Sequence, residues 1–298
     1  MRSVLITGAA GNLGRKLTAA LLQTSWCEEV IAVDRSAGSG ASDRRVRHVE
    51  ADLTDPRDAR WRDALAGADG VVHLAARNPN PDSPWDDAAA SFDMTLLLVG
   101  TAAASGVRRF VFASSNHVMG RYKDPPLAEG LPRGGLSPLL VPGPGTRWFN
   151  GREIVDGVAY ATSKLMGERL CMASAALSEG AFTTVSIRIG WCQPGENDPA
   201  TINSTGVAGA ESTAGPDADR DLRWFRNMWL SNGDFASVME RALVADASGW
   251  PAPGIVVNGM SANTGMTWDL EMGRSLIGYA PRDDVWKRLG DVPSFLGG

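Results

Sequence analysis

Residue types that build disulfide frameworks and metal sites are scarce in this chain. Its 298 residues include only three cysteines and three histidines. They are Cys27, Cys171 and Cys192, and His48, His73 and His117. The cysteines are odd in number and far apart, so we expect no disulfide framework and a reducing, cytoplasmic environment. The histidines form no metal-ligand spacing with the cysteines, so we expect no bound metal.

Long apolar runs and an excess of positive charge are also missing. No apolar run approaches the roughly 18–20 residues that a membrane helix needs, so we expect no membrane partner. The opening segment MRSVLITG leads straight into a strand pattern, and we expect no signal peptide before it. The net charge is −5 and the calculated pI is about 5.3, and no basic patch is interleaved with aromatic residues. This balance argues against a nucleic-acid partner.

Strand and helix patterns alternate through the first 190 residues. Short β-branched runs predict strands, which cover residues 4–7, 30–33, 46–49, 70–74, 109–113 and 183–189. Apolar spacing of three and four predicts helices, which cover residues 13–23, 85–105 and 159–177. This alternation predicts an α/β fold with a doubly wound parallel Rossmann sheet.

The pattern loosens after residue 190. We expect a helix over 235–245, with Ser231 or Asn232 near its N-cap, then a strand over 255–258 and a helix over 268–276. We therefore predict a dinucleotide-binding Rossmann domain over 1–190. A small C-terminal substrate-binding subdomain over 191–298 is expected to be partly interleaved with it and to lie over the carboxyl edge of the sheet.

Two connecting stretches are unusually long. Residues 121–158 contain six prolines and many glycines, and residues 193–221 are polar and rich in glycine and alanine. Loops beyond roughly 12–15 residues are uncommon in compact domains and often serve as lids or binding loops. The alternative is that they are decoration without a binding role.

A glycine-rich segment, TGAAGNLG, joins the first expected strand to the first expected helix. Gly8 permits a tight turn, Gly11 lets a pyrophosphate approach the backbone, and Gly14 allows close helix packing. The helix that follows offers free N–H groups and its positive dipole end to a phosphate. The segment therefore predicts a dinucleotide site.

An acidic residue about twenty positions later specifies the dinucleotide. Asp34 ends the second expected strand, where a carboxylate binds both ribose hydroxyls and repels a 2′-phosphate. We therefore expect NAD as the cofactor. The adjacent Arg35 keeps NADP open as the less favoured alternative.

A tyrosine and a lysine four residues apart suggest acid–base chemistry. Tyr160 and Lys164 share one helix face. A phenol with a pKa near ~10 is a poor base at neutral pH, and a nearby ammonium group favours the phenolate. Ser115 ends the fifth expected strand, in the crevice where a substrate hydroxyl is expected.

These motifs, in this order, resemble those of the extended short-chain dehydrogenase/reductases, the NAD-dependent epimerase/dehydratase family. The resemblance rests on TGAAGNLG, ADLTD, HLAA, SSNHVMG and YATSK. It implies Ser115, Tyr160 and Lys164 as the catalytic residues. It also implies a homodimer formed through the helices at 85–105 and 159–177. The implied cofactor contacts are Gly8, Gly11, Asn12, Leu13, Gly14, Asp34, Arg35, Asp52, Leu53, Leu74, Ala75, Ala76, Tyr160, Lys164 and Ile189.

Within this superfamily the chain resembles the uronate dehydrogenases. The shared motifs are FASSNH, Tyr-x-x-Ser-Lys-x-x-Gly-Glu, Arg-Ile-Gly-x-Cys and Trp-x-Ser-x-x-Asp-Phe. That family oxidises the C1 hydroxyl of a free hexuronate with NAD. The resemblance implies that Ser115, Asn116 and His117 contact the substrate. It also implies that Arg223 or Arg226 holds the substrate carboxylate.

Several positions depart from the uronate dehydrogenase pattern at the expected mouth of the site. Trp191 and Asn78 both stand where that family has a serine, and both long loops look like insertions. A tryptophan in place of a small hydroxyl residue removes a hydrogen bond and fills space, so we expect an altered substrate that is still polar and sugar-like. Four tryptophans in or beside the loops form either an aromatic platform for the substrate or packing that fastens the loops: Trp148, Trp191, Trp224 and Trp229.

Two other functions remain open. An epimerase or dehydratase would keep NAD bound and return the hydride. Met119 and Gly190 count against it, because nucleotide-sugar epimerases differ at these positions. A dinucleotide sensor without catalysis is the third possibility. The retained Ser115, Tyr160 and Lys164 count against that alternative.

Overall fold

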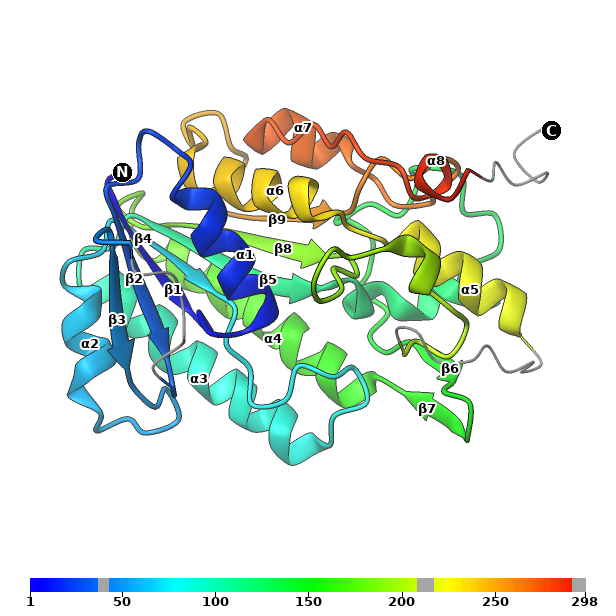
Figure 1. Cartoon of the computed structure of the whole chain (residues 1–298), viewed down its shortest axis with the longest axis horizontal. Helices are drawn as coiled ribbons and strands as arrows, with labels where there is room; N and C mark the ends of the chain where they lie inside the picture. The colour runs from blue at the N-terminus through cyan, green and yellow to red at the C-terminus, as the bar shows by residue number, and fades with distance from the viewer. Residues whose placement is uncertain (37–42, 208–216, 291–298) are drawn as a thin grey trace.

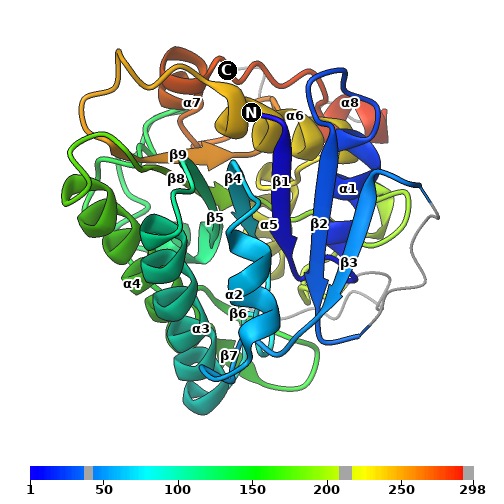
Figure 2. The ribbon, with the colours of Figure 1, turned by 90° about the vertical axis from the view of Figure 1, so that its left-hand side faces the viewer.

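A seven-stranded parallel sheet forms the centre of the computed structural model, with helices on both of its faces (Figures 1 and 2). The structure describes residues 1–36, 43–207 and 217–290. The strand order is β3-β2-β1-β4-β5-β8-β9. These strands are β1 (Ser3–Thr7), β2 (Glu29–Asp34), β3 (Val46–Glu50), β4 (Gly70–His73), β5 (Arg109–Ser115), β8 (Thr183–Ile189) and β9 (Gly254–Gly259). The predicted doubly wound Rossmann sheet is confirmed.

The central strands form because most of their residues are apolar on both sides. Every residue of β1 and β5 is buried, whereas β3, at the sheet edge, is largely exposed. A parallel sheet covered on both faces needs such continuous apolar runs. Along β1 the side chains alternate between two cores, with Val4 and Ile6 in one and Leu5 in the other.

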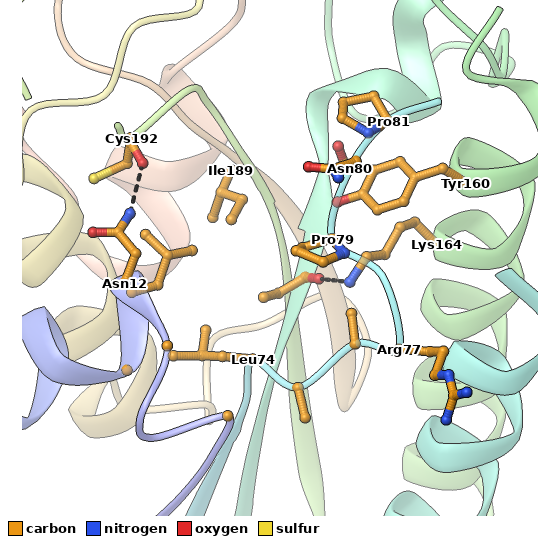
Figure 3. Close-up of a pocket in the computed structure, with 18 of the residues that line it drawn as sticks. Asn12, Leu74, Arg77, Pro79, Asn80, Pro81, Tyr160, Lys164, Ile189 and Cys192 are labelled. Atoms are coloured by element: carbon orange, nitrogen blue, oxygen red, sulfur yellow. Dashed lines mark hydrogen bonds between the residues drawn. The ribbon is translucent and has the colours of Figure 1, made fainter. Parts of the chain in front are cut away.

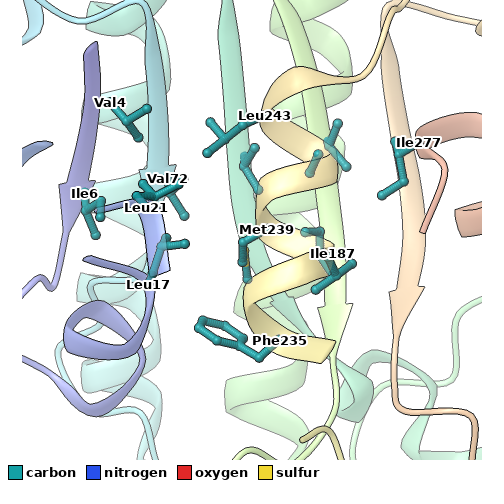
Figure 4. Close-up of a cluster of buried hydrophobic side chains, with 14 of the residues drawn as sticks. Val4, Ile6, Leu17, Leu21, Val72, Ile187, Phe235, Met239, Leu243 and Ile277 are labelled. Carbon is teal, nitrogen blue, oxygen red and sulfur yellow. The ribbon is translucent and has the colours of Figure 1, made fainter. Parts of the chain in front are cut away.

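Each face of the sheet is covered by its own set of helices. Helices α1 (Asn12–Leu21), α6 (Asn232–Val244) and α7 (Glu271–Ile277) cover one face. On that face Phe235, Met239 and Leu243 of α6 pack against the strands (Figure 4). The opposite face is covered by α2 (Ala59–Leu65), α3 (Trp85–Ala104) and α4 (Val158–Ala176).

The C-terminal segment contributes to the main sheet itself. The strand expected over 255–258 is β9, which pairs in parallel with β8. The helix expected over 235–245 begins earlier, at Asn232, because the Ser231 hydroxyl caps it by accepting a hydrogen bond from the Asp234 N–H. The C-terminal part of the chain therefore supplies one strand of the main sheet.

The expected helix over 268–276 begins later than predicted. Trp268 forms an isolated parallel bridge with Leu136, and helix α7 starts only at Glu271. This contact comes from residues far apart in the sequence, so local helix periodicity did not reveal it.

The long connecting stretches pack against the body around a third apolar core. Residues 121–158 continue η1 (Asn116–Lys123) and include the antiparallel hairpin of β6 (Arg147–Phe149) and β7 (Ile154–Asp156). The second stretch contains η2 (Pro199–Thr201) and leads into α5 (Ala218–Asn227), while residues 208–216 lie outside the described residues. This core also includes residues of α8 (Val285–Leu289). Its larger members are Leu136, Trp148, Trp224, Phe225, Trp229, Trp268 and Trp286.

Across the ranges described above, no helix combines the length and the apolar character that a membrane span requires.

Candidate active site

A cavity of about 900 Å³ opens at the carboxyl ends of the parallel strands. It runs from the end of β2, past the glycine loop after β1, to the end of β5 and the first turns of α4. Strand order reverses between β1 and β4, and ligands of open α/β sheets bind at this switch point. The cavity therefore lies where the topology places a dinucleotide.

The glycine loop needs glycine at two positions for steric reasons. Gly8 has a φ of +69°, and a Cβ there would lie 2.8 Å from the Ala75 nitrogen. At Gly14 a Cβ would overlap the Gly8 carbonyl oxygen and lie 2.6 Å from the Ala9 Cα. Gly11 is the exposed N-cap of α1 and lines the cavity. The loop thus forms a cradle that presents the N–H groups of a helix N-terminus, as a pyrophosphate requires.

Asp34 offers a fixed carboxylate at the far end of the cavity. One of its oxygens accepts a hydrogen bond from the Ala10 N–H (2.9 Å), and the other accepts from the Arg35 N–H (2.8 Å). A carboxylate accepts several hydrogen bonds per oxygen, so both oxygens keep capacity for ribose hydroxyls. The glycine cradle and this acceptor together fit an adenine dinucleotide.

Apolar side chains line the middle of the cavity. Leu74 and Ile189 face it between the two ends (Figure 3). Asn12 Nδ2 donates a 3.0 Å hydrogen bond to the Cys192 carbonyl oxygen and so links the start of α1 to the segment after β8. This bond holds the two sides of the cavity together.

Tyr160 and Lys164 lie together on α4 at the other end of the cavity (Figure 3). The buried Lys164 Nζ donates a 2.8 Å hydrogen bond to the Ala113 carbonyl oxygen and lies 5.7 Å from the centroid of the Tyr160 ring. Burial lowers the pKa of Lys164 to about 8. Burial also raises the pKa of Tyr160, and the neighbouring Ser115 side chain opposes that rise.

Three consecutive polar residues, beginning with the last residue of β5, lie beside that pair. The Ser115 hydroxyl accepts a 3.2 Å hydrogen bond from the His117 N–H. Asn116 Nδ2 donates to the Ile189 carbonyl oxygen (3.0 Å), while its buried Oδ1 has no partner among the described residues. His117 Nδ1 shares a 2.7 Å hydrogen bond with the Thr146 hydroxyl. Burial lowers the pKa of His117 to about 4, so its ring is neutral near pH 7.

Four rings continue from Tyr160 along the cavity and form what we call the aromatic wall: His117, Trp148, Phe225 and Trp191. The ring centroid of His117 lies 5.9 Å from that of Tyr160 and 6.1 Å from that of Trp148. Phe225 lies edge-on to both Trp148 (6.2 Å) and Trp191 (5.6 Å). Of the four tryptophans, Trp148 and Trp191 line the cavity and Trp224 and Trp229 do not. Trp148, Trp224 and Trp229 are members of the third core, and Trp191 packs against it.

Most residues expected at the site lie along this cavity. Every residue expected to contact the cofactor lines it, and so do four of those expected to contact the substrate. The cofactor set is Gly8, Gly11, Asn12, Leu13, Gly14, Asp34, Arg35, Asp52, Leu53, Leu74, Ala75, Ala76, Tyr160, Lys164 and Ile189, and the four others are Ser115, Asn116, His117 and Trp191.

Three residues expected to contact the substrate do not line the cavity. Asn78 Nδ2 donates to Asp87 Oδ2 (3.1 Å) and so ties its loop to α3. Arg223 is exposed on α5, and the Arg226 guanidinium lies 5.5 Å from the Trp286 ring centroid. Successive residues of a helix are rotated by about 100°, so α5 turns Phe225 toward the cavity and both arginines away from it.

Other cavity-lining residues were missed from the sequence because they carry no motif. They come from the loop after β4, from the hairpin, from the second long stretch and from α5. Among them are Arg77, Pro79, Asn80, Pro81, Asp82, Asn150, Thr205, Gly206, Val207, Phe225 and Met228. The unusual length of the two loops was the only signal for several of them.

Neither the cavity nor the rest of the described chain gathers three or more His, Cys, Asp or Glu side chains in a group suited to a metal ion. His73 has a structural role, because its two ring nitrogens share hydrogen bonds with the Thr7 hydroxyl (2.7 Å) and the Thr95 hydroxyl (3.1 Å).

Two curated relatives align over nearly the whole chain. L-arabinose 1-dehydrogenase (NAD(P)(+)) of Haloferax volcanii is 30% identical over 292 residues, which cover 95% of this chain and 98% of the relative. Uronate dehydrogenase of Agrobacterium fabrum is 28% identical over 286 residues, which cover 96% of this chain and 86% of the relative.

A solved structure has the same fold over almost its full length. Glucuronic acid dehydrogenase from Chromohalobacter salexigens superposes with a TM-score of 0.67 at 26% identity, covering 97% of this chain and 88% of that chain. A family model described as the NAD dependent epimerase/dehydratase family matches residues 4–203. The resemblance read from the sequence motifs is thereby confirmed, and the chain belongs to the NAD-dependent epimerase/dehydratase family.

Proposed function

We propose that this protein is an NAD-dependent oxidoreductase that oxidises a hemiacetal or secondary hydroxyl of a sugar or sugar-acid-like molecule. One observation carries the proposal. A single cavity joins the glycine cradle and Asp34 at one end to Ser115, Tyr160 and Lys164 at the other. The named relatives, which are dehydrogenases of a sugar and of sugar acids, support the same reaction class.

The residues of the cavity suit NAD. The glycine cradle and the N-terminus of α1 would hold the pyrophosphate, and Asp34 would accept hydrogen bonds from the adenosine ribose. Lys164 would hold the second ribose. When bound, NAD accepts the hydride that leaves the substrate carbon. The carboxylate of Asp34 disfavours a 2′-phosphate, so NADP is the weaker cofactor in this proposal.

Tyr160 acts as the base that removes the proton of the substrate hydroxyl. Because burial raises the pKa of the phenol, it needs a positive charge to work near neutral pH. Lys164 supplies that charge from below the ring. Ser115 and Asn116 hold the substrate oxygen beside the phenol, which is the positioning that general-base catalysis requires.

Reduced-nicotinamide absorbance tests this function. The purified protein is mixed with NAD and a panel of free aldoses, hexuronates and sugar-like alcohols. The expected result is a signal that Tyr160→Phe lowers by about 10² to 10⁴-fold, as loss of a general base does. Absence of any signal, with NAD co-purifying, would contradict net oxidation and indicate an epimerase or dehydratase that recycles its cofactor.

We also infer a role for the C-terminal part of the chain. Residues 191–298 would supply substrate contacts, since Trp191, Val207 and Phe225 line the cavity.

A homodimer would pair α3 and α4, where Leu96 and Met166 are exposed apolar side chains. A shift to monomer in Leu96→Glu, measured by sedimentation, would support this pairing. The three free cysteines fit the reducing cytoplasm as the place of action.

A further inference from the structure

The end of the cavity beyond Tyr160 is where a substrate would lie, and we call it the substrate end. One side is formed by the loop segment 79–82, whose Asn80 and Pro81 lie beside Tyr160 (Figure 3). The aromatic wall, Val207 and Met228 also line the cavity. Trp148 is fixed there by a 2.9 Å hydrogen bond from its Nε1 to the Thr205 carbonyl oxygen.

No cationic side chain of the described residues serves the substrate end. Lysine or arginine lines the cavity at three positions, and each belongs elsewhere. Arg35 follows β2 at the opposite end, and Lys164 is bonded to the Ala113 carbonyl oxygen below Tyr160. Arg77 turns away from Tyr160 and pairs with Asp87 on α3, with 3.7 Å between Nε and Oδ1 (Figure 3).

The rest of the chain does not supply the missing cation either. The segments outside the described residues, 37–42, 208–216 and 291–298, contain no lysine or arginine in the sequence. The charged side chain that the substrate end does have is acidic, Asp82. His117 is neutral near pH 7 because burial lowers its pKa to about 4. A carboxylate taken out of water here would therefore meet no opposite charge, which is strongly unfavourable.

The buried side-chain oxygen of Asn116 needs a hydrogen-bond donor from the substrate. Asn116 is 4% exposed, and its Oδ1 has no hydrogen-bond partner among the described residues. The amide orientation is fixed, because Nδ2 donates to the Ile189 carbonyl oxygen. A buried lone acceptor is satisfied by an O–H group and not by a carboxylate oxygen.

We propose that the substrate is an uncharged sugar whose apolar face packs on the aromatic wall, with a hydroxyl other than the reacting one donating to Asn116, and that sugar acids are excluded. This inference rests on the proposed oxidoreductase function and narrows its substrate class. Trp191, the partly exposed ring of the aromatic wall, can cover the C–H face of a pyranose or a deoxy carbon. Sugar acids are excluded because the aromatic wall carries no positive charge that could pair with their carboxylate.

Three matched sugars test the charge preference directly. D-galactose, D-galacturonate and D-fucose differ only in the group on carbon 5, which is CH₂OH, COO⁻ or CH₃. We expect kcat/KM with NAD to be about 10²-fold higher for D-galactose and D-fucose than for D-galacturonate. The corresponding glucose series gives a second, independent comparison. A uronate used as well as its neutral counterpart in either series would overturn the inference.

A variant with an added positive charge tests whether the lack of a cation is what excludes sugar acids. Val207 lines the substrate end and is 53% exposed, so a longer side chain fits there without disturbing the core. We expect Val207→Arg to raise the ratio of kcat/KM for uronate over neutral sugar about 10-fold, an effect that weakens with added salt. The matched variant Val207→Gln should leave that ratio unchanged. An unchanged ratio in Val207→Arg would overturn the charge explanation.

The dehydrogenase function and the neutral substrate are contradicted by different results. Oxidation of uronates in preference to neutral sugars would leave the dehydrogenase function standing and overturn the neutral substrate. Absence of reduced nicotinamide with every sugar, charged or neutral, would contradict the dehydrogenase function and the neutral substrate with it.

Discussion

Glu168 and Arg188 form a bidentate ion pair sealed in the interior, one helical turn beyond Lys164. Both hydrogen bonds, from Arg188 Nε and Nη2 to the two carboxylate oxygens, measure 2.8 Å, and the side chains are 0% and 1% exposed. The Ser114 hydroxyl donates a third bond to Glu168 (2.6 Å). This network ties α4, which carries Tyr160, to the ends of β5 and β8.

Breaking this pair from one side should destabilise the protein strongly. Arg188→Met leaves the Glu168 charge buried and unpaired, and we expect a loss of about 3–5 kcal/mol in the free energy of unfolding, measured by urea denaturation. The double variant Glu168→Met/Arg188→Met should recover much of the loss. As control, Arg274→Gln removes the exposed pair with Glu271 and should cost about 0–1 kcal/mol. Equal effects of the buried and exposed changes would contradict this account.

Asp34 should determine the choice between NAD and NADP. Asp34→Asn removes the charge that repels a 2′-phosphate, so the kcat/KM ratio of NAD over NADP should fall by about 10-fold or more. Steady-state rates with both cofactors measure it. Glu50, the partner of Asp34 on β3, does not line the cavity, so Glu50→Gln is the matched control. A similar shift in both variants would mean that general surface charge, not Asp34, sets the preference.

His117 should make the protein less stable in acid. Its pKa is lowered from 6.5 to about 4 in the folded state, so between these values the unfolded chain binds a proton that the folded protein does not. The free energy of unfolding must then fall as the pH drops from 6.5 toward 4.

His117→Gln should make that pH dependence shallower by up to one proton, about 1.4 kcal/mol per pH unit. The measurement is chemical denaturation at several pH values. His48 is exposed on β3, so His48→Gln should keep the slope of the natural protein. A slope unaltered by His117→Gln would show that this ring is not held neutral by burial.

Two glycine substitutions should have opposite effects. Gly14→Ala forces a methyl group into the glycine loop, so we expect about 1–3 kcal/mol of destabilisation and weaker NAD binding. Gly100, in the interior of α3, has no atom within 4 Å of an added Cβ. Gly100→Ala should therefore stabilise the protein by about 0.5–1 kcal/mol. Thermal unfolding and NAD titration distinguish them, and a harmless Gly14→Ala would refute the cradle geometry.

The features predicted well from sequence are those that depend on local patterns. Most strands of the sheet are short runs rich in apolar residues, and the glycine loop and the Tyr160–Lys164 pair have fixed spacings. The position of Trp148 was left open and Phe225 was missed, because their places depend on contacts between distant segments. The rotation of successive residues along α5 places Phe225, and not Arg226, at the cavity. No helix was expected there from the sequence, so this could not be predicted.

Deuterium transfer tests the central claim most directly. A sugar that carries deuterium on all its carbons is incubated with NAD and the purified protein, and the free nicotinamide and the sugar products are analysed by mass spectrometry. The account predicts one deuterated, reduced nicotinamide released for each sugar oxidised, at a rate about 10² to 10⁴-fold lower with Tyr160→Phe. Deuterium retained in an isomerised or dehydrated sugar, with no reduced nicotinamide in solution, would contradict it.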